Sequence, residues 1–250
     1  MKNLILVKLG GSVITDKSKP FTARTNVISR LGKKIKKEYM SESTDLIIGH
    51  GGGSFPHVPA SKYQTQKGLI GKNSVWGFCL TADAAIEINR IVVKELLKLK
   101  MNVASFAPMS FMYEGKILNE HFKKAFSLGI IPVIYGDTAL DEKQGFHISS
   151  TEVILDRLAK KFAKYYKKIT ILYFTDTNGV YDNKGKTIEK ITPKNFSEIK
   201  KYLTGSGNVD VTGGMIHKVK ESLDLVKKLD AEVYIMNGLS RGKITKICRS

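Results

Sequence analysis

Near its start the chain contains Leu4-Ile5-Leu6-Val7-Lys8-Leu9-Gly10-Gly11-Ser12, which is the strongest indication of its fold class. The apolar run 4–7 predicts a buried strand, which the glycine pair 10–11 ends. The same arrangement returns downstream, where the strand predicted over 45–48 runs directly into Gly49-His50-Gly51-Gly52-Gly53-Ser54. Two buried strands, each followed at once by a glycine-rich turn, are typical of open α/β sheets that bind ligands beyond the carboxyl ends of their strands.

Outward from these two units, strands and helices alternate along the chain. Helices are predicted over 24–39, 80–99, 151–164 and 215–229, and further strands over 103–106, 130–134, 169–174 and 232–236. Short hairpins are predicted near 110–118 and at the turn 183–186. The alternation predicts a three-layer αβα sandwich with a mainly parallel central sheet, because crossover helices cover both faces of a parallel sheet. We expect one domain over 1–250, made of two lobes, 1–148 and 149–250.

Composition limits the classes of function. The 250 residues include 41 Lys+Arg against 23 Asp+Glu, a net charge of +18 that suits anionic partners such as nucleotides, phosphate esters or nucleic acid. There is neither a signal-peptide pattern nor an apolar run near the roughly 18–20 residues of a bilayer span, so we expect a cytoplasmic protein without a membrane partner. Cys79 and Cys248 stand far apart without a CxxC partner, which gives no support to a disulfide framework or a metal site.

A nucleic-acid-binding protein is a rival interpretation that rests on charge alone. Many of the lysines fall on predicted solvent faces of helices, such as 33–37 and 160–168. The sequence has neither an RNA-recognition signature nor a basic stripe interleaved with stacking aromatic residues. We therefore expect no nucleic-acid partner.

The glycine clusters and the lysines beside them point to phosphate chemistry. Lys8 adds a positive charge at the end of the first strand, and a third cluster, 210–215, places Lys218 one turn into the following helix. Exposed backbone N–H groups and helix N-termini bind phosphate oxygens. None of the clusters has P-loop spacing or the dinucleotide fingerprint. Phosphoryl transfer needs positive charge and N–H donors around two phosphates in line, and these segments supply both.

Four segments in order resemble the amino acid kinase superfamily: Lys8-Leu9-Gly10-Gly11-Ser12, Gly51-Gly52-Gly53, Phe174-Thr175-Asp176, and Gly213-Gly214-Met215 with Lys218. Two further features look like the isopentenyl phosphate kinases in particular. These are the extension Ser12-Val13-Ile14-Thr15-Asp16-Lys17 and the stretch Gly51-Gly52-Gly53-Ser54-Phe55-Pro56-His57, which is similar to that family's GGGSFGH.

The resemblance implies a kinase that uses ATP with Mg²⁺, phosphorylates isopentenyl phosphate by direct in-line transfer and works as a homodimer. It implies that lobe 1–148 binds the acceptor and lobe 149–250 binds ATP. The implied catalytic residues are Lys8, Lys17 and His57. The implied ATP-binding residues are Lys8, Gly10, Gly11, Ser12, Gly53, Asp176, Gly213 and Lys218. For the acceptor, Gly52, His57 and Gly136 would contact phosphate, and Phe78, Ala82 and Ile86 would line the pocket for the isoprenoid tail.

Three positions depart from the family pattern. Pro56 replaces the usual glycine before His57, Asn178 stands where aspartate is frequent, and Thr151 falls where relatives have an aspartate that orients the two ATP lysines. Glu152 is one position away, but successive helical residues point about 100° apart. The Thr151 departure keeps a degenerate ATP-binding sensor open as an alternative. A second alternative is a kinase that acts on another small phosphate or phosphonate, such as fosfomycin.

Overall fold

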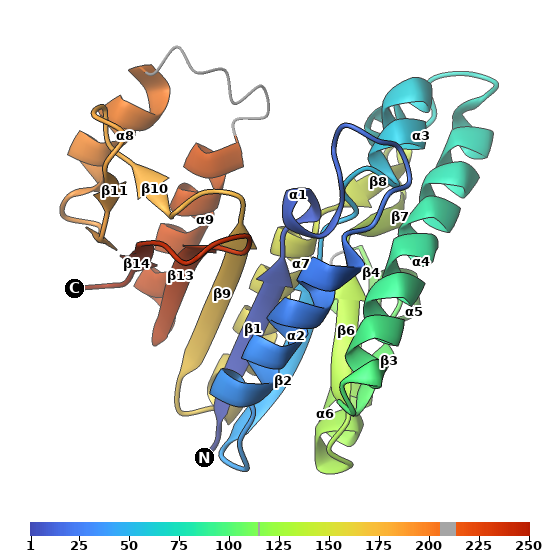
Figure 1. Cartoon of the computed structure of the whole chain (residues 1–250). Helices are drawn as coiled ribbons and strands as arrows, with labels where there is room; N and C mark the ends of the chain where they lie inside the picture. The colour runs from blue at the N-terminus through green and yellow to red at the C-terminus, as the bar shows by residue number, and fades with distance from the viewer. Residues whose placement is uncertain (115, 206–213) are drawn as a thin grey trace.

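A mainly parallel sheet forms the centre of the molecule. The structure is a computed structural model, and it describes residues 1–114, 116–205 and 214–250. Within these ranges the sheet has eight strands in the order β12-β14-β13-β9-β1-β2-β6-β3 (Figure 1). Of the pairings between them, that of β13 with β14 is antiparallel, and β12 runs parallel to β14. The strands are β1 Asn3–Leu9, β2 Thr44–His50, β3 Val103–Ser105, β6 Ile131–Tyr135, β9 Ile169–Thr175, β12 Lys190–Ile191, β13 Ala231–Asn237 and β14 Ile244–Ile247.

Helices cover both faces of this sheet, which confirms the predicted three-layer sandwich. Helices α2 (Thr25–Tyr39) and α4 (Ser74–Lys98) cover one face, and α6 (Glu120–Ser127), α7 (Thr151–Phe162) and α9 (Gly214–Lys228) lie on the other (Figure 1). The alternation of side chains along β1 divides the core accordingly.

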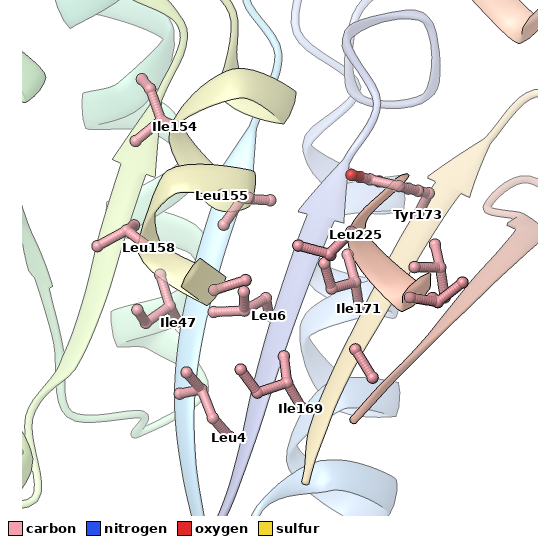
Figure 2. Packing of buried hydrophobic residues seen from close by; sticks show 14 of the residues in the cluster. Leu4, Leu6, Ile47, Ile154, Leu155, Leu158, Ile169, Ile171, Tyr173 and Leu225 are labelled. Atoms are coloured by element: carbon pink, nitrogen blue, oxygen red, sulfur yellow. The ribbon is translucent and has the colours of Figure 1, made fainter. Parts of the chain in front are cut away.

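The two halves of the core meet at β1. Leu4 and Leu6 pack with Leu155 and Leu158 of α7 (Figure 2), whereas Val7 and Leu9 pack toward α2 and α4. Each of these side chains is fully buried, and burying one such side chain contributes about 1.5–3 kcal/mol.

Shorter elements connect the layers. The two predicted hairpins are present as β4 (Met112–Tyr113) with β5 (Lys116–Ile117), and β10 (Val180–Tyr181) with β11 (Thr187–Ile188). A third hairpin, β7 (Asp137–Asp141) with β8 (Gly145–Ser149), was not predicted. The remaining elements are α1 Gly11–Ile14, α3 His57–Tyr63, η1 Thr65–Lys67, α5 Pro108–Phe111, η2 Ala163–Tyr165 and α8 Phe196–Gly205.

Helix α4 begins at Ser74, six residues before the predicted start. The Ser74 hydroxyl oxygen accepts hydrogen bonds from the N–H groups of Ile70 and Gly71, both at 3.0 Å, and so fixes the turn that leads into the helix. Among the described residues, no helix has both the length and the apolar character to cross a bilayer.

Candidate active site

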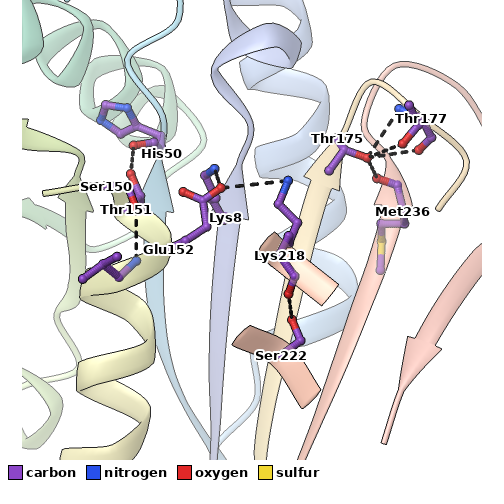
Figure 3. Close-up of polar contacts among 11 residues, drawn as sticks. Lys8, His50, Ser150, Thr151, Glu152, Thr175, Thr177, Lys218, Ser222 and Met236 are labelled. Atoms are coloured by element: carbon purple, nitrogen blue, oxygen red, sulfur yellow. Dashed lines mark hydrogen bonds and ion pairs between the residues drawn. The ribbon is translucent and has the colours of Figure 1, made fainter. Parts of the chain in front are cut away.

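A carboxylate and two lysines meet at the carboxyl ends of β1 and β9. Lys8 comes from β1, Glu152 from the first turn of α7, and Lys218 from α9 (Figure 3). The Lys8 ammonium group donates to Glu152 Oε1, and Lys218 Nζ lies 4.0 Å from the same oxygen. The three side chains are only 11–20% exposed, so water screens their charges weakly.

Electrostatics keep Glu152 ionised. Burial alone would raise the pKa of Glu152, but the positive charges of Lys8 and Lys218 outweigh this effect and lower the pKa below its ordinary value. The Glu152 carboxylate is therefore negatively charged and attracts the ammonium groups of both Lys8 and Lys218. The sequence left open whether Glu152 can substitute for an aspartate at position 151, and in the structure Glu152 contacts both lysines.

Thr151 has a different task. It is 2% exposed, and its hydroxyl donates to the carbonyl oxygen of His50 at 2.6 Å (Figure 3). Ser150 caps α7, because its hydroxyl accepts the N–H of Val153 at 3.3 Å. The Ser150 bond caps α7, the Thr151 bond ties the start of the helix to β2, and Glu152, the next residue, projects to the lysines.

The first two glycine clusters lie against each other at the same edge of the sheet. A Cβ atom on Gly11 would lie 2.5 Å from the Gly53 nitrogen, and one on Gly10 would lie 2.6 Å from the Phe174 carbonyl oxygen. Gly53 also has φ +55°, which favours glycine. Close packing between the two loops is therefore one physical reason for these glycines.

Lys17 lies on the loop between α1 and α2 and reaches toward the end of β9. Its Nζ is 3.8 Å from Asp176 Oδ2, and both side chains are exposed, 70% and 45% respectively. Lys17 and Asp176 were both predicted site residues, and the structure brings them together.

His57 begins α3, directly after the second glycine cluster. Partial burial lowers its pKa below the ordinary value of 6.5, and the nearby positive charges of Lys17 and Lys8 lower it further. His57 is therefore close enough to Lys8 and Lys17 to be affected by the charges of both predicted site lysines. At neutral pH the imidazole is uncharged and can donate one N–H to a phosphate oxygen.

The residues predicted for the acceptor lie around β6, α3 and α4. A Cβ atom on Gly52 would lie 2.0 Å from the Pro56 ring, so the proline that departs from the family pattern requires glycine there. The N–H of Gly136 donates to the His50 carbonyl oxygen at 3.3 Å, and in this structure it is engaged there.

The apolar residues predicted for the tail lie along α4 at intervals of four, so they share one helix face. The Phe78 ring packs on Phe146 of β8 with centroids 5.0 Å apart, Ala82 is buried, and Ile86 is 41% exposed. The face therefore runs from an aromatic pair at one end to an exposed isoleucine at the other.

Sequence reasoning missed two supporting residues in this region. Thr15 is fully buried between the glycine clusters, donates to the Gly11 carbonyl oxygen at 2.7 Å and accepts the Ser54 N–H at 3.0 Å. Asn89 of α4 contacts the buried ring of His50 at 3.1 Å. Neither has a local signal beyond being a polar residue next to apolar ones, because the partners lie far away in the sequence.

At the carboxyl ends of β9 and β13, two loops are tied together. Thr175 is the last residue of β9, and its hydroxyl lies within donating distance of two carbonyl oxygens, those of Thr177 and Met236 (Figure 3). The side-chain amide of Asn237, at the end of β13, donates a hydrogen bond to Asn178 Oδ1 at 2.9 Å. This bond links the end of β13 to the loop that follows β9. The predicted site residue Gly213 lies outside the described residues.

The described residues contain no group of three or more His, Cys, Asp or Glu side chains that could hold a metal ion. Two hollows of about 440 and 450 Å³ share the lining residues Lys2, Asp45 and Phe126, at the amino ends of β1 and β2. The opposite edge, with the glycine clusters and the lysines, is where such sheets bind substrates.

This edge, with lysines from separate elements around paired glycine loops, defines a phosphotransferase of small molecules. The amino acid kinase family model matches residues 3–237. The chain belongs to the amino acid kinase family and, within it, to the isopentenyl phosphate kinases.

Two relatives carry this assignment. The chain is 34% identical to the isopentenyl phosphate kinase of Methanocaldococcus jannaschii, over 97% of this chain and 94% of that protein. It is 30% identical to the isopentenyl phosphate kinase of Methanothermobacter thermautotrophicus, with the same two coverages.

Solved structures agree on the fold. An isopentenyl phosphate kinase in a substrate complex superimposes with a TM-score of 0.76 at 23% identity, covering 97% of this chain and 99% of the other. The carbamate kinase of Giardia lamblia bound to AMP-PNP gives 0.66 at 12% identity, covering 100% and 99%.

Proposed function

We propose that this protein transfers the γ-phosphoryl group of ATP to isopentenyl phosphate, giving ADP and isopentenyl diphosphate in isoprenoid biosynthesis. The observation that carries the proposal is the cluster of Lys8, Glu152 and Lys218 beside the paired glycine loops, with Lys17 paired to Asp176 at the end of β9. Identity to isopentenyl phosphate kinases along nearly the whole chain supports the choice of acceptor.

In the proposed reaction, an oxygen of the acceptor phosphate attacks the γ-phosphorus in line. The bond between that phosphorus and the β–γ bridging oxygen breaks, and ADP carries the bridging oxygen away. Lys8 and Lys218 bind the phosphates of ATP, and Lys17 stabilises the charge on the group in transfer. Without substrates, three lysines face two carboxylates, Glu152 and Asp176, which leaves one net positive charge to attract phosphate.

We assign the remaining site residues to two proposed lobes of the chain. Residues 1–148 would bind the acceptor, with Gly52, His57 and Gly136 around its phosphate and the α4 face Phe78, Ala82 and Ile86 along its tail. Residues 149–250 would bind ATP, together with the glycine loops of β1 and β2. The nucleotide enters as Mg-ATP, because Mg²⁺ bridges nucleotide phosphates and keeps much of its water.

We also propose a cytoplasmic homodimer. Leu69, Ile70, Val75 and Trp76 are 53–59% exposed around the start of α4, and an exposed apolar patch of this kind suits a second copy of the chain. Cys79 and Cys248 are both unpaired, as is usual in a reducing compartment. Sedimentation equilibrium of the wild type and of Trp76→Glu tests the dimer.

The decisive test of function is ADP release with Mg-ATP and a panel of acceptors. The panel contains isopentenyl phosphate, dimethylallyl phosphate, fosfomycin, UMP, acetylglutamate and carbamate. We expect the highest kcat/KM with isopentenyl phosphate. Preference for another member would overturn the acceptor and keep the kinase. ATP binding without turnover on any acceptor would favour the sensor.

A further inference from the structure

The loop that carries Lys17 is held in shape by backbone hydrogen bonds between its two ends. Its ends are joined by a β-bridge between Thr15 and Ala23, and the Asp16 N–H donates to the Thr22 carbonyl oxygen at 2.8 Å. The Lys17 side chain, two residues after the bridge at Thr15, is 70% exposed. Its place over the site therefore depends on what holds the loop.

Ser54 holds the loop with every polar atom it has. Its N–H donates to Thr15 Oγ1 at 3.0 Å, its carbonyl oxygen accepts the Phe21 N–H at 3.2 Å, and its hydroxyl oxygen accepts the Thr22 N–H at 3.4 Å. The residue is 7% exposed. Ser54 belongs to the second glycine cluster, between Gly52 and His57, the residues proposed to contact the acceptor.

Phe21 has a strained backbone at this contact. Its φ is +51°, a left-handed conformation that is a genuine outlier for a bulky residue. Its ring packs edge-to-face on Phe55, with centroids 5.5 Å apart; Phe55 is 1% exposed, whereas Phe21 is 45% exposed. Such strain costs on the order of 1–3 kcal/mol and persists only where the surroundings impose it, which is frequent at functional sites.

We infer that Ser54 and Phe21 are positioning residues that lock the Lys17 loop onto the acceptor-binding loop. The inference rests on the proposed function and deepens it. The lock makes Lys17 and the acceptor loop one rigid unit, so that a phosphate bound between Gly52 and His57 meets the Lys17 ammonium group at a fixed position. Rigid placement matters because a displacement of about 1 Å can lower the rate of a positioned reaction by about 10²-fold.

The kinetic test is a double-mutant cycle between Phe21→Ala and Lys17→Ala. We expect Phe21→Ala to lower kcat about tenfold or more, with KM for Mg-ATP within about twofold, because Lys17 acts on the group in transfer. In the Lys17→Ala background the same change has less than about a twofold effect on kcat, since the lock has no lysine to position. Phe21→Tyr keeps the ring and is expected to retain wild-type kcat.

Trypsin cleavage after Lys17 tests the lock without any turnover. We expect Phe21→Gly to be cut there about tenfold faster than the wild type, because local opening exposes the loop to the protease. Lys100→Gly is the matched control: Lys100 also has a positive φ, +54°, but lies at the other end of the sheet. It relieves the same kind of strain and leaves both kcat and cleavage after Lys17 unchanged.

Either of two results overturns the inference: equal effects of Phe21→Ala in both backgrounds, or equal cleavage of Phe21→Gly and wild type. If the wild type does not phosphorylate isopentenyl phosphate, the proposed function fails. The cycle is then measured on whichever acceptor turns over, and trypsin decides on the lock if none does.

Discussion

Lys8 and Glu152, 144 positions apart in the sequence, form a direct ion pair at the carboxyl end of β1. Glu152 supplies the negative charge between the two lysines. In the family pattern this charge comes from an aspartate at the position of Thr151. Glutamate has one more methylene group than aspartate, and this length lets it reach Lys8 and Lys218 from its position on α7. The Thr151 departure thus leaves the charge network complete.

Removing the charge of Glu152 tests this arrangement. We expect Glu152→Gln to lower kcat about 10- to 100-fold, or about 1.4–2.7 kcal/mol in the barrier, because two partly buried lysines then repel each other and lose their position. KM for Mg-ATP changes less, since the net positive charge of the site rises. Steady-state kinetics measure both. Thr151→Ser, which keeps the hydroxyl bond to the His50 carbonyl oxygen, serves as control, and an unchanged kcat in Glu152→Gln would refute the role of the carboxylate.

Lys17 is expected to act on the reaction and not on the fold. Lys17→Ala should lower kcat by about 10²-fold or more, the usual effect of removing a group that stabilises transition-state charge. Its exposed pair with Asp176 contributes at most about 1 kcal/mol, so thermal unfolding should change little. Lys19→Ala, on the same exposed loop, is the matched control for charge. Equal kcat in the two variants would remove Lys17 from the mechanism.

His57 should report acceptor binding through its titration. Burial and the charges of Lys17 and Lys8 lower its pKa in the free protein. A phosphate dianion at the ring favours the protonated form, so we expect the pKa to rise when isopentenyl phosphate binds. By linkage, the acceptor then binds more tightly as the pH falls through this range.

NMR titration of the His57 ring with and without acceptor measures this shift. The internal control is His50, which is fully buried and whose pKa burial lowers. A pKa of His57 that is the same with and without acceptor would argue against contact with the phosphate.

Asp137 should make stability depend on pH. It is 2% exposed, and burial raises its pKa to about 6 from 3.8, although bonds from Thr138 oppose the rise. The native state therefore holds this proton more tightly than the unfolded chain, and stability falls as the pH rises from about 4 to about 6, by on the order of 3 kcal/mol. Above that range the loss is complete and constant.

Asp137→Asn removes the titration while keeping the shape. We expect a higher free energy of unfolding at pH 7 and a flatter profile between pH 4 and 6 in urea denaturation at several pH values. The exposed Asp83→Asn should retain the wild-type profile. If Asp137→Asn shows the wild-type slope, the slope comes from another group.

Local patterns predicted most of the fold. The strand at 4–7 and the helix at 24–39 correspond to β1 and α2, because an apolar run or a 3.6-residue period is a property of neighbouring residues. The β7–β8 hairpin was missed, since its strands carry polar residues such as Asp137 and His147 among apolar ones. The turn is local, since Asp141 accepts the N–H groups of Lys143 and Gln144, but the packing of β7 against α4 and α5 is a long-range contact that no short window of sequence contains.

The αβα class, the alternation of buried strands and helices, and the two glycine clusters after β1 and β2 all follow from the order of residues along the chain. Hydrophobic periodicity and glycine act locally, so these features can be read residue by residue. The folded arrangement, in contrast, is what joins Glu152 to Lys8 and Lys218 and lets Ser54 bond to the Lys17 loop with all its polar atoms. Such contacts depend on how α7, α9 and the loops pack on the sheet, where a shift of one residue turns a helical side chain by about 100°.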